Sequence, residues 1–256
     1  MKHISAKIGC MLVLLLVAVA GLRGQDRSFR LGFQTGPAIS WLNNNENLIT
    51  RTGGHLGLKL GTTAEIHFSD SYAMTFGLGL GFHQGGEFQY SIGGNFLPNS
   101  TLSDPTLNTG DKPLPDGVKI DYRLQYIELP VGLKLRSREM GYNRFFIEAP
   151  IITLAILTRG RGDISAEQFL FERENIRKDL RFANIFWGLG AGIERSISLN
   201  NSVTAGIYYQ NGLIDVTKNK GHRAIDNPEV VPPFLLQDEK SRATLSNLIL
   251  RLGIFF

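Results

Sequence analysis

The sequence predicts an all-β fold: an eight-stranded antiparallel up-and-down transmembrane β-barrel, preceded by a cleaved N-terminal signal peptide. Three observations favour it. Eight segments alternate between apolar and small or polar residues, the period of a strand whose two faces meet different surroundings. The connections between them alternate between long and short, as in barrels of the bacterial outer membrane. The chain also ends on an aromatic residue, Phe256, within the last alternating segment.

Residues 1–24 have the features of a secretory signal peptide. Two lysines precede a short apolar core, Cys10 to Ala20, which is too short to span a bilayer as a helix. Cleavage is expected after Ala20 or Gly24, which leaves residues 25–256 as one barrel domain. The mature protein would then contain no cysteine, and hence neither a disulfide nor a thiolate metal site.

The bulk composition is compatible with such a barrel. The mean hydropathy of the 256-residue chain is −0.04, a middling value that is expected because a barrel strand shows lipid only every second side chain. The formal net charge is +4, but loss of the signal peptide removes three basic side chains and leaves 24 basic against 23 acidic ones. The high isoelectric point therefore does not indicate a nucleic-acid partner.

The first three segments alternate most clearly. Apolar side chains occupy every second position of residues 29–41, 56–68 and 72–82, and the third segment continues less regularly to Tyr90. Each segment is therefore expected to form a strand with one apolar face and one small or polar face.

The remaining five segments are less uniform. The fourth, residues 118–135, shifts its apolar phase by one residue near Tyr126, which predicts a β-bulge there. The fifth, residues 145–157, is apolar on both faces except at Glu148 and Thr153, so its facing stays open. The sixth, seventh and eighth segments cover residues 183–194, 203–213 and 247–256.

The apolar faces are expected to meet lipid. A soluble barrel would bury them and present polar side chains outside, whereas here the opposite faces are rich in glycine, as at Gly188, Gly190 and Gly192. The lumen of an eight-stranded barrel is only wide enough to be filled by side chains, so small residues belong there. Pro130 and Pro150 lie inside expected strands and are interpreted as local bulges.

The connections predict how the barrel lies in the outer membrane of a diderm bacterium. The long connections are expected to be extracellular and the short ones periplasmic, which places both termini in the periplasm. The long connections cover residues 42–51, 93–117, 158–181 and 214–242, and the short ones cover residues 69–71, 137–143 and 198–202. Aromatic residues near strand ends are expected to form two interfacial girdles: Trp41, Tyr72, Tyr90, Tyr122, Tyr142 and Tyr208.

Two motifs resemble those of a known family. Tyr126-Ile127-Glu128-Leu129-Pro130 resembles the YxExP signature of the PorT-like outer-membrane β-barrel family, and Tyr209 to Val216, which includes Gly212 and Leu213, resembles its YxxGLxxI pattern. The resemblance covers essentially the whole mature chain and implies the same barrel fold. Because the family's namesake is implicated in type IX protein secretion, the resemblance also implies secretion-system proteins as partners.

Charged residues on the expected inner faces form the candidate functional site. An unpaired charge in a narrow, poorly hydrated lumen is costly, so these side chains are expected to pair and plug the barrel. The alternative is a selective pore or a proton path. The set comprises Lys59, Glu65, Glu128, Lys134, Arg136, Glu148, Glu194 and Arg251.

No cofactor, metal or catalytic site is expected. The histidines lack metal-binding spacing, and the sequence has neither a nucleophile elbow nor a glycine-rich phosphate loop. His222 with Asp226 and Ser241 is the strongest candidate for a membrane-embedded hydrolase, but surface loops collect such residues by chance.

Two long connections carry apolar residues of their own. Ser165 to Gln168 has the pattern of a capping box, so a short amphipathic helix is expected to follow it and either to cover the barrel mouth or to dock a partner. The stretch from Leu213 to Leu236 is apolar and must fold back or meet another protein.

The function favoured by the sequence is that of a non-enzymatic integral barrel, a structural or assembly component of the outer membrane. Its expected partners are outer-membrane lipid and the barrel-assembly machinery, which would engage the last strand through Phe256 as a C-terminal insertion signal. A small passive pore and a membrane-embedded hydrolase are the alternatives.

Overall fold

The computed structural model describes residues 29–109, 111–167, 169–198, 201–226 and 234–256. The expected signal peptide lies outside these residues. No helix of the described residues is long and apolar enough to cross a membrane.

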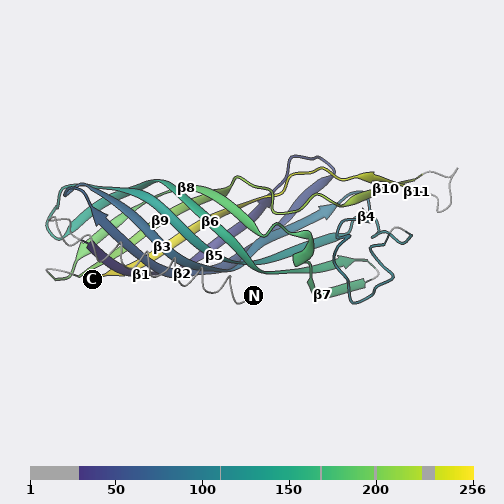
Figure 1. Ribbon diagram of the computed structural model, residues 1–256, viewed down its shortest axis with the longest axis horizontal. Helices are drawn as coiled ribbons and strands as arrows, with labels where there is room; N and C mark the ends of the chain where they lie inside the picture. The colour runs from purple at the N-terminus through teal and green to yellow at the C-terminus, as the bar shows by residue number, and fades with distance from the viewer. Residues whose placement is uncertain (1–28, 110, 168, 199–200, 227–233) are drawn as a thin grey trace, which may run out of the picture.

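Eight strands form a closed ring (Figure 1). Each pairs antiparallel with the next long strand along the chain, and β12 pairs back with β1, so the predicted up-and-down barrel is confirmed. The strands are β1 (Phe29–Asn43), β2 (Ile49–His67), β3 (Tyr72–Tyr90), β5 (Lys119–Arg136), β6 (Asn143–Ala166), β8 (Ala183–Ser196), β9 (Ser202–Gly212) and β12 (Thr244–Phe255).

The other elements lie at the end of the molecule opposite the C-terminus (Figure 1). We call this end the extension; it also includes the parts of the barrel strands beyond the lipid-facing belt described below. β4 (Gly94–Asn95), β10 (His222–Asp226) and β11 (Phe234–Asp238) form a small sheet, β7 (Phe169–Asn175) pairs with the end of β6, and the short 3-10 turn η1 spans Arg177–Asp179.

The exposed apolar side chains confirm that the apolar strand faces point outward. Leu56 is 71% exposed, Phe33 is 62% exposed and Ile207 is 61% exposed, values that would be unfavourable in water and are expected against lipid. On β5 this apolar belt runs from Ile127 to Leu135, and at about 3.3 Å per residue and a tilt of about 40° it covers roughly 20 Å, close to the ~25 Å apolar band of such barrels.

Above the belt the polarity of the strands is reversed. Ile120, Tyr122 and Leu124 of β5 point inward and are almost fully buried, whereas Arg123 and Gln125 point outward. The extension is therefore built like a soluble protein, with an apolar core inside and polar groups outside.

This reversal explains the phase shift in the fourth segment. Even-numbered residues of β5 face inward along the whole strand, so the strand itself contains no bulge at Tyr126. The register does shift at this level, but the extra residues belong to the neighbours: Thr158 in β6, and the stretch between Gly81 and Gln84 in β3. The predicted bulge was thus placed at the right height and in the wrong strand. Where a strand passes from lipid to water, its apolar residues change from the outer face to the inner face, and this change shifts the apolar pattern by one residue without any bulge.

The two prolines behave differently. The register of β6 with β8 shifts between Glu148 and Ile151, as expected of a bulge at Pro150. Pro130 pairs in register with Thr153 and has no bulge, so that prediction was wrong. Gly77 on the adjacent strand makes room for its ring, since a Cβ there would lie 2.8 Å from the Pro130 Cγ.

Other details correct the expectations for the connections. Residues 44–48 alone join β1 to β2, so the first connection is short, because both strands continue into the extension. The helix expected after Ser165 is wrong: β6 and β7 form a hairpin in which Ala166 pairs with Phe169. Phe169 and Phe171 alternate and pack against the buried apolar core, an arrangement that a strand satisfies.

The aromatic residues divide between outside and inside. Tyr72 and Tyr142 are exposed, and Trp41 lies at the outer surface beside Tyr209, with ring centroids 6.4 Å apart. The expectation of girdle positions was wrong for Tyr90, Tyr122 and Tyr208, which are buried inside.

Candidate functional site

The predicted inner-face charges all lie inside the barrel, in three groups. At the end nearest the C-terminus, the Lys134 ammonium lies 2.6 Å from a Glu65 oxygen and 3.2 Å from a Glu194 oxygen. Arg30 pairs with Glu194 at 2.6 Å, and Arg136 lies 3.7 Å from the same carboxylate. Four strands thus contribute to one buried cluster.

The second group surrounds Glu148 of β6. The Arg251 guanidinium lies 3.9 Å from its carboxylate, and the Thr75 hydroxyl donates a hydrogen bond to it over 2.6 Å. The guanidinium carbon of Arg251 also lies 3.8 Å from the centre of the Tyr208 ring, a cation–π contact.

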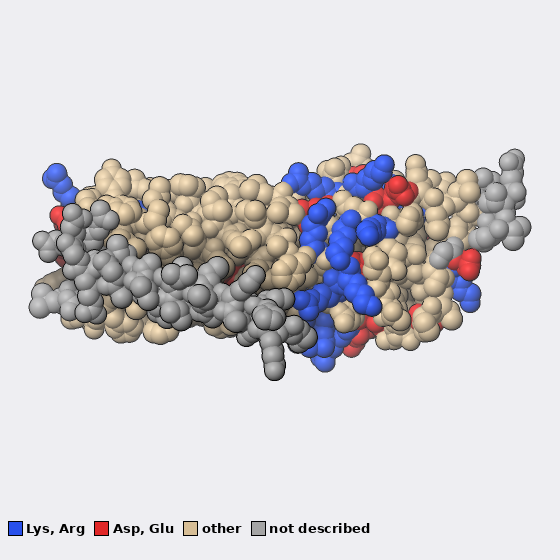
Figure 2. All heavy atoms as spheres, viewed as in Figure 1, with Lys and Arg blue, Asp and Glu red and all other residues tan. Residues whose placement is uncertain are grey.

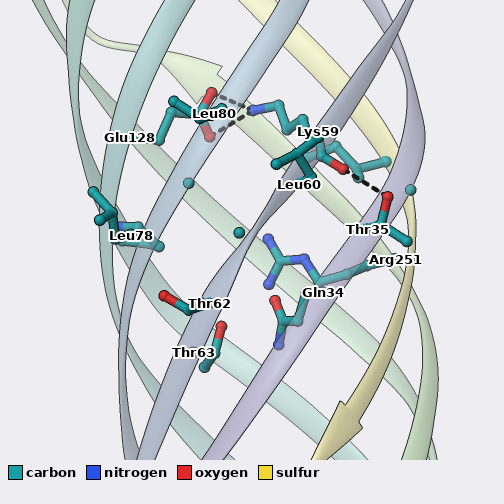
Figure 3. A pocket seen from close by; sticks show the side chains of 15 residues that line it. Gln34, Thr35, Lys59, Leu60, Thr62, Thr63, Leu78, Leu80, Glu128 and Arg251 are labelled. Carbon is teal, nitrogen blue, oxygen red and sulfur yellow. Dashed lines mark hydrogen bonds and ion pairs between the residues drawn. The ribbon is translucent and has the colours of Figure 1, made fainter.

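The third group joins Lys59 of β2 to Glu128 of β5 (Figure 3). The Lys59 ammonium donates to both Glu128 oxygens, at 2.7 and 2.9 Å, and to the Gln210 side-chain oxygen at 2.7 Å. Gln84 donates to Glu128 at 3.0 Å. The hollow between this pair and the labelled Arg251 and Gln34 is about 40 Å³, room for no more than a few water molecules.

Glycines are placed where large side chains cross the lumen. A Cβ at Gly190 would lie 2.1 Å from the Tyr208 ring, and one at Gly81 would lie 1.7 Å from the Gln84 amide nitrogen. A narrow lumen is thus filled by a few large side chains that need bare backbone opposite them.

An apolar core closes the lumen above the charged groups. Tyr126 and Phe186 meet edge to face, with centroids 6.3 Å apart, directly above the Lys59 and Glu128 pair. The core continues through Leu124 and Leu157 and takes in side chains from the long connections: Phe96, Leu97, Leu102, Leu114, Ile176, Leu180 and Val216.

Two tyrosines lie in the part of this core within the extension. The Tyr90 and Tyr122 hydroxyls are 2.8 Å apart and share a hydrogen bond. Burial raises the pKa of both phenols, so they stay protonated and neutral across the physiological range.

The YxExP-like segment lies at the junction of the two interiors. Tyr126 points into the apolar core, and Glu128 points into the charged lumen below it. In the second motif, Tyr209 packs against Trp187 on the outer surface, Gly212 ends β9, and the Leu213 backbone N–H donates to Ile185.

A family model matches residues 22–218, more than three quarters of the chain: that of the outer membrane protein beta-barrel domain. The chain belongs to this family. Its place is therefore the bacterial outer membrane. Comparison with curated protein sequences finds no match.

Solved outer-membrane barrels of other bacteria are similar at low identity. Neisserial surface protein A is 10% identical, with 90% of this chain and 98% of that chain covered and a TM-score of 0.42. OprG from Pseudomonas aeruginosa is 11% identical (90% and 97% covered, TM-score 0.42). The outer membrane protease OmpT from Escherichia coli is 9% identical (91% and 97% covered, TM-score 0.36).

Of the loop residues considered for hydrolysis, the side chains of His222 and Ser241 are described, whereas that of Asp226 lies outside the described part of the structure. The His222 Nε2 atom lies 3.4 Å from Asp238 of β11, and Ser241 is buried, with its backbone N–H donating to Glu239. No hydrogen bond joins His222 to Ser241 in the described part of the chain. Nor do those residues contain a group of three or more acidic, histidine or cysteine side chains suited to a metal ion.

Several lumen residues were missed by sequence reasoning. Arg30 holds Glu194, while Gln84 and Gln210 complete the shell around Lys59 and Glu128. Arg30 falls on the inner face by simple alternation and could have been found. Gln84 could not, because the shifted register beside it obscures its facing.

Proposed function

We propose that this protein is a non-enzymatic, non-conducting integral barrel that serves as a structural or assembly component of the outer membrane. One observation supports this above the others: the lumen is closed twice, by paired charges and by an apolar core above them. A path for ions would have to break the Lys59–Glu128 pair and then cross the buried Tyr126 and Phe186 rings.

Neither closure is easily opened. Separating a buried ion pair leaves two uncompensated charges at low dielectric, and the core above holds side chains of both the barrel and the long connections. Movement of one loop would therefore leave the barrel residues of the plug in place.

Single-channel recording in planar bilayers tests the proposal. The purified protein should insert without unitary conductance steps, while a porin of known conductance in the same bilayer shows that steps are detectable. Reproducible steps from the protein alone would contradict a closed lumen and favour the small pore.

The finer role rests on the PorT-like resemblance of the segment from Tyr126 to Pro130 and of the Tyr209 motif. It supports a link to type IX secretion, with secretion-system proteins as partners. Deletion of the gene should then reduce the secreted and surface-attached proteins of the native bacterium. Unchanged profiles would remove the secretion role and leave the structural one.

The last strand supports engagement of the barrel-assembly machinery from the periplasm. Phe256 follows β12, its backbone N–H donates to Leu31, and its half-exposed ring packs edge to face on Phe33. Removal of Phe256 should lower the amount of assembled barrel in cells more than removal of the exposed Tyr142 ring by Tyr142→Ala. Equal assembly of the two variants would argue against an insertion signal.

A further inference from the structure

A cluster of arginines lies on the outer surface, where the apolar belt ends. Arg123 of β5, Arg159 and Arg161 of β6 and Arg173 of β7 line a hollow of about 150 Å³ together with His83. Figure 2 shows lysine and arginine side chains gathered in a band beside the uncharged surface of the barrel.

The acidic groups beside this hollow are already engaged. Asp163 lies 2.5 Å from the Arg123 guanidinium and accepts the Arg173 backbone N–H at 2.7 Å. Asp121 lies 3.1 Å from Arg123 and 2.5 Å from His55. Burial opposes ionisation of Asp121, yet these two partners hold its pKa below the usual value, so it is ionised.

Among the described residues, three guanidinium groups of the hollow have no carboxylate partner. The side chains of Arg159, Arg161 and Arg173 form no ion pair or hydrogen bond with any residue that the structure describes. The hollow therefore has an excess of positive charge. The pKa of His83 is lowered by burial and by the nearby His55 and Arg123, which is consistent with this excess.

The strand register concentrates this charge instead of dispersing it. Arg123 and Arg161 are directly opposite each other on β5 and β6, an arrangement that disfavours pairing of the strands when both carry the same charge. His83 and Arg173 also have positive φ values, 54° and 58°, uncommon for residues with a side chain and often found at binding sites. An anion in the hollow would compensate the opposed arginines.

The position of the hollow relative to the apolar belt indicates which molecule supplies that anion. Gln125 and Arg123 are the next outward residues of β5 after the lipid-facing Ile127. On β6, Arg159 lies opposite Gln125, just beyond Ile156 and the bulged Thr158. The arginines therefore lie at the level of the lipid headgroups. Arginine matches the geometry of phosphate oxygens and can bind them through two parallel hydrogen bonds.

We propose that this hollow binds the phosphate group of a membrane lipid in the leaflet next to the extension. The proposal depends on the transmembrane fold and not on whether the lumen conducts. Basic pockets at the membrane surface recognise anionic headgroups through this chemistry.

Native mass spectrometry of the detergent-solubilised protein tests it, with phosphatidic acid and phosphatidylcholine as probes. The wild type should retain a phosphatidic acid molecule under conditions that remove phosphatidylcholine. Arg159→Gln/Arg161→Gln should weaken phosphatidic acid binding by roughly ten- to thirty-fold. The matched control is Arg138→Gln/Arg195→Gln, which removes two exposed arginines near the short connections at the other end of the barrel.

The binding results distinguish a lipid phosphate in the hollow from diffuse attraction to surface charge and from binding of free phosphate. Retention of phosphatidic acid by the control and its loss from the hollow variant would support the site. Equal weakening of both variants would overturn it in favour of diffuse charge, and displacement of the lipid by an equal concentration of inorganic phosphate would overturn the lipid assignment. Both double variants alter side chains at the outer surface, and an unchanged heat-dependent gel shift would show that each still folds.

Discussion

Glu128 lies where the charged lumen meets the apolar core, so its partners define the closure most sharply. It accepts hydrogen bonds from Lys59 and Gln84, two groups on different strands. A charge that is so enclosed stabilises the barrel only while its partners are present.

Reversal of this charge should destabilise the barrel. In Glu128→Lys a second ammonium would face Lys59 in a space with room for no more than a few water molecules, and loss of a buried partner costs about 3–5 kcal/mol. The temperature at which the folded band disappears on SDS gels should fall clearly. Glu128→Gln keeps the size and part of the hydrogen bonding, and should show a smaller loss. Heat resistance of the reversed variant equal to wild type would contradict the role of the pair.

Gly190 tests whether the glycines make room for large lumen side chains. Gly190→Leu should clash with the Tyr208 ring and destabilise the barrel by about 1–3 kcal/mol, the usual range for overpacking. Tyr208→Ala in the same chain should recover part of that loss. Ala191→Leu, whose side chain faces lipid on the same strand, is the control and should be nearly neutral. Failure of Tyr208→Ala to relieve the Gly190→Leu defect would show that the ring is not the obstacle.

At the scale of elements, the strands were predictable where one face meets lipid and the other a narrow lumen. Alternation placed all eight barrel strands, and glycine content gave the facing correctly. β6 stayed ambiguous because both of its faces carry apolar residues. On the inner face Phe146 and Ile151 pack within the lumen, and Leu157 packs in the apolar core above the charged groups. On the outer face Leu154 belongs to the lipid belt. A single sequence does not mark the height at which lipid ends.

The long connections were the least predictable elements. The capping pattern at Ser165 competes with the alternation of Phe169 and Phe171, and the pattern alone does not reveal the apolar core on which these rings pack. Packing of the Phe169 and Phe171 rings against this core favours strand β7 over a helix.

The extension should loosen without loss of the membrane barrel. Ile164 of β6 is fully buried in the apolar core of the extension. Ile164→Asp places a charge in that core and should make the β6–β7 hairpin sensitive to protease. Leu170→Asp, at a position 61% exposed on the same hairpin, should have little effect. In both variants the folded band on SDS gels should persist on heating as in wild type. Loss of that band in Ile164→Asp would mean that barrel and extension unfold as one unit.

At the scale of the whole molecule, the polarity reversal along one continuous strand links the membrane barrel to a water-facing β structure. Strands such as β3 and β5 carry lipid-facing leucines below and buried aromatic residues above, with the Lys59–Glu128 pair and the arginine hollow at the transition. Closure of the lumen, the position of the basic hollow and the stability of the extension all follow from this reversal.

Spin labels along β5 test the reversal most directly. Single cysteines are introduced from residue 119 to residue 135 in a chain that lacks residues 1–24 and hence has no other cysteine. In vesicles, labels at odd positions from 127 to 135 should be accessible to oxygen, and those from 119 to 125 to a water-soluble nickel chelate. Labels at even positions should be shielded from both. Chelate access at odd positions along the whole strand would contradict contact with lipid, and oxygen access along the whole strand would contradict the reversal.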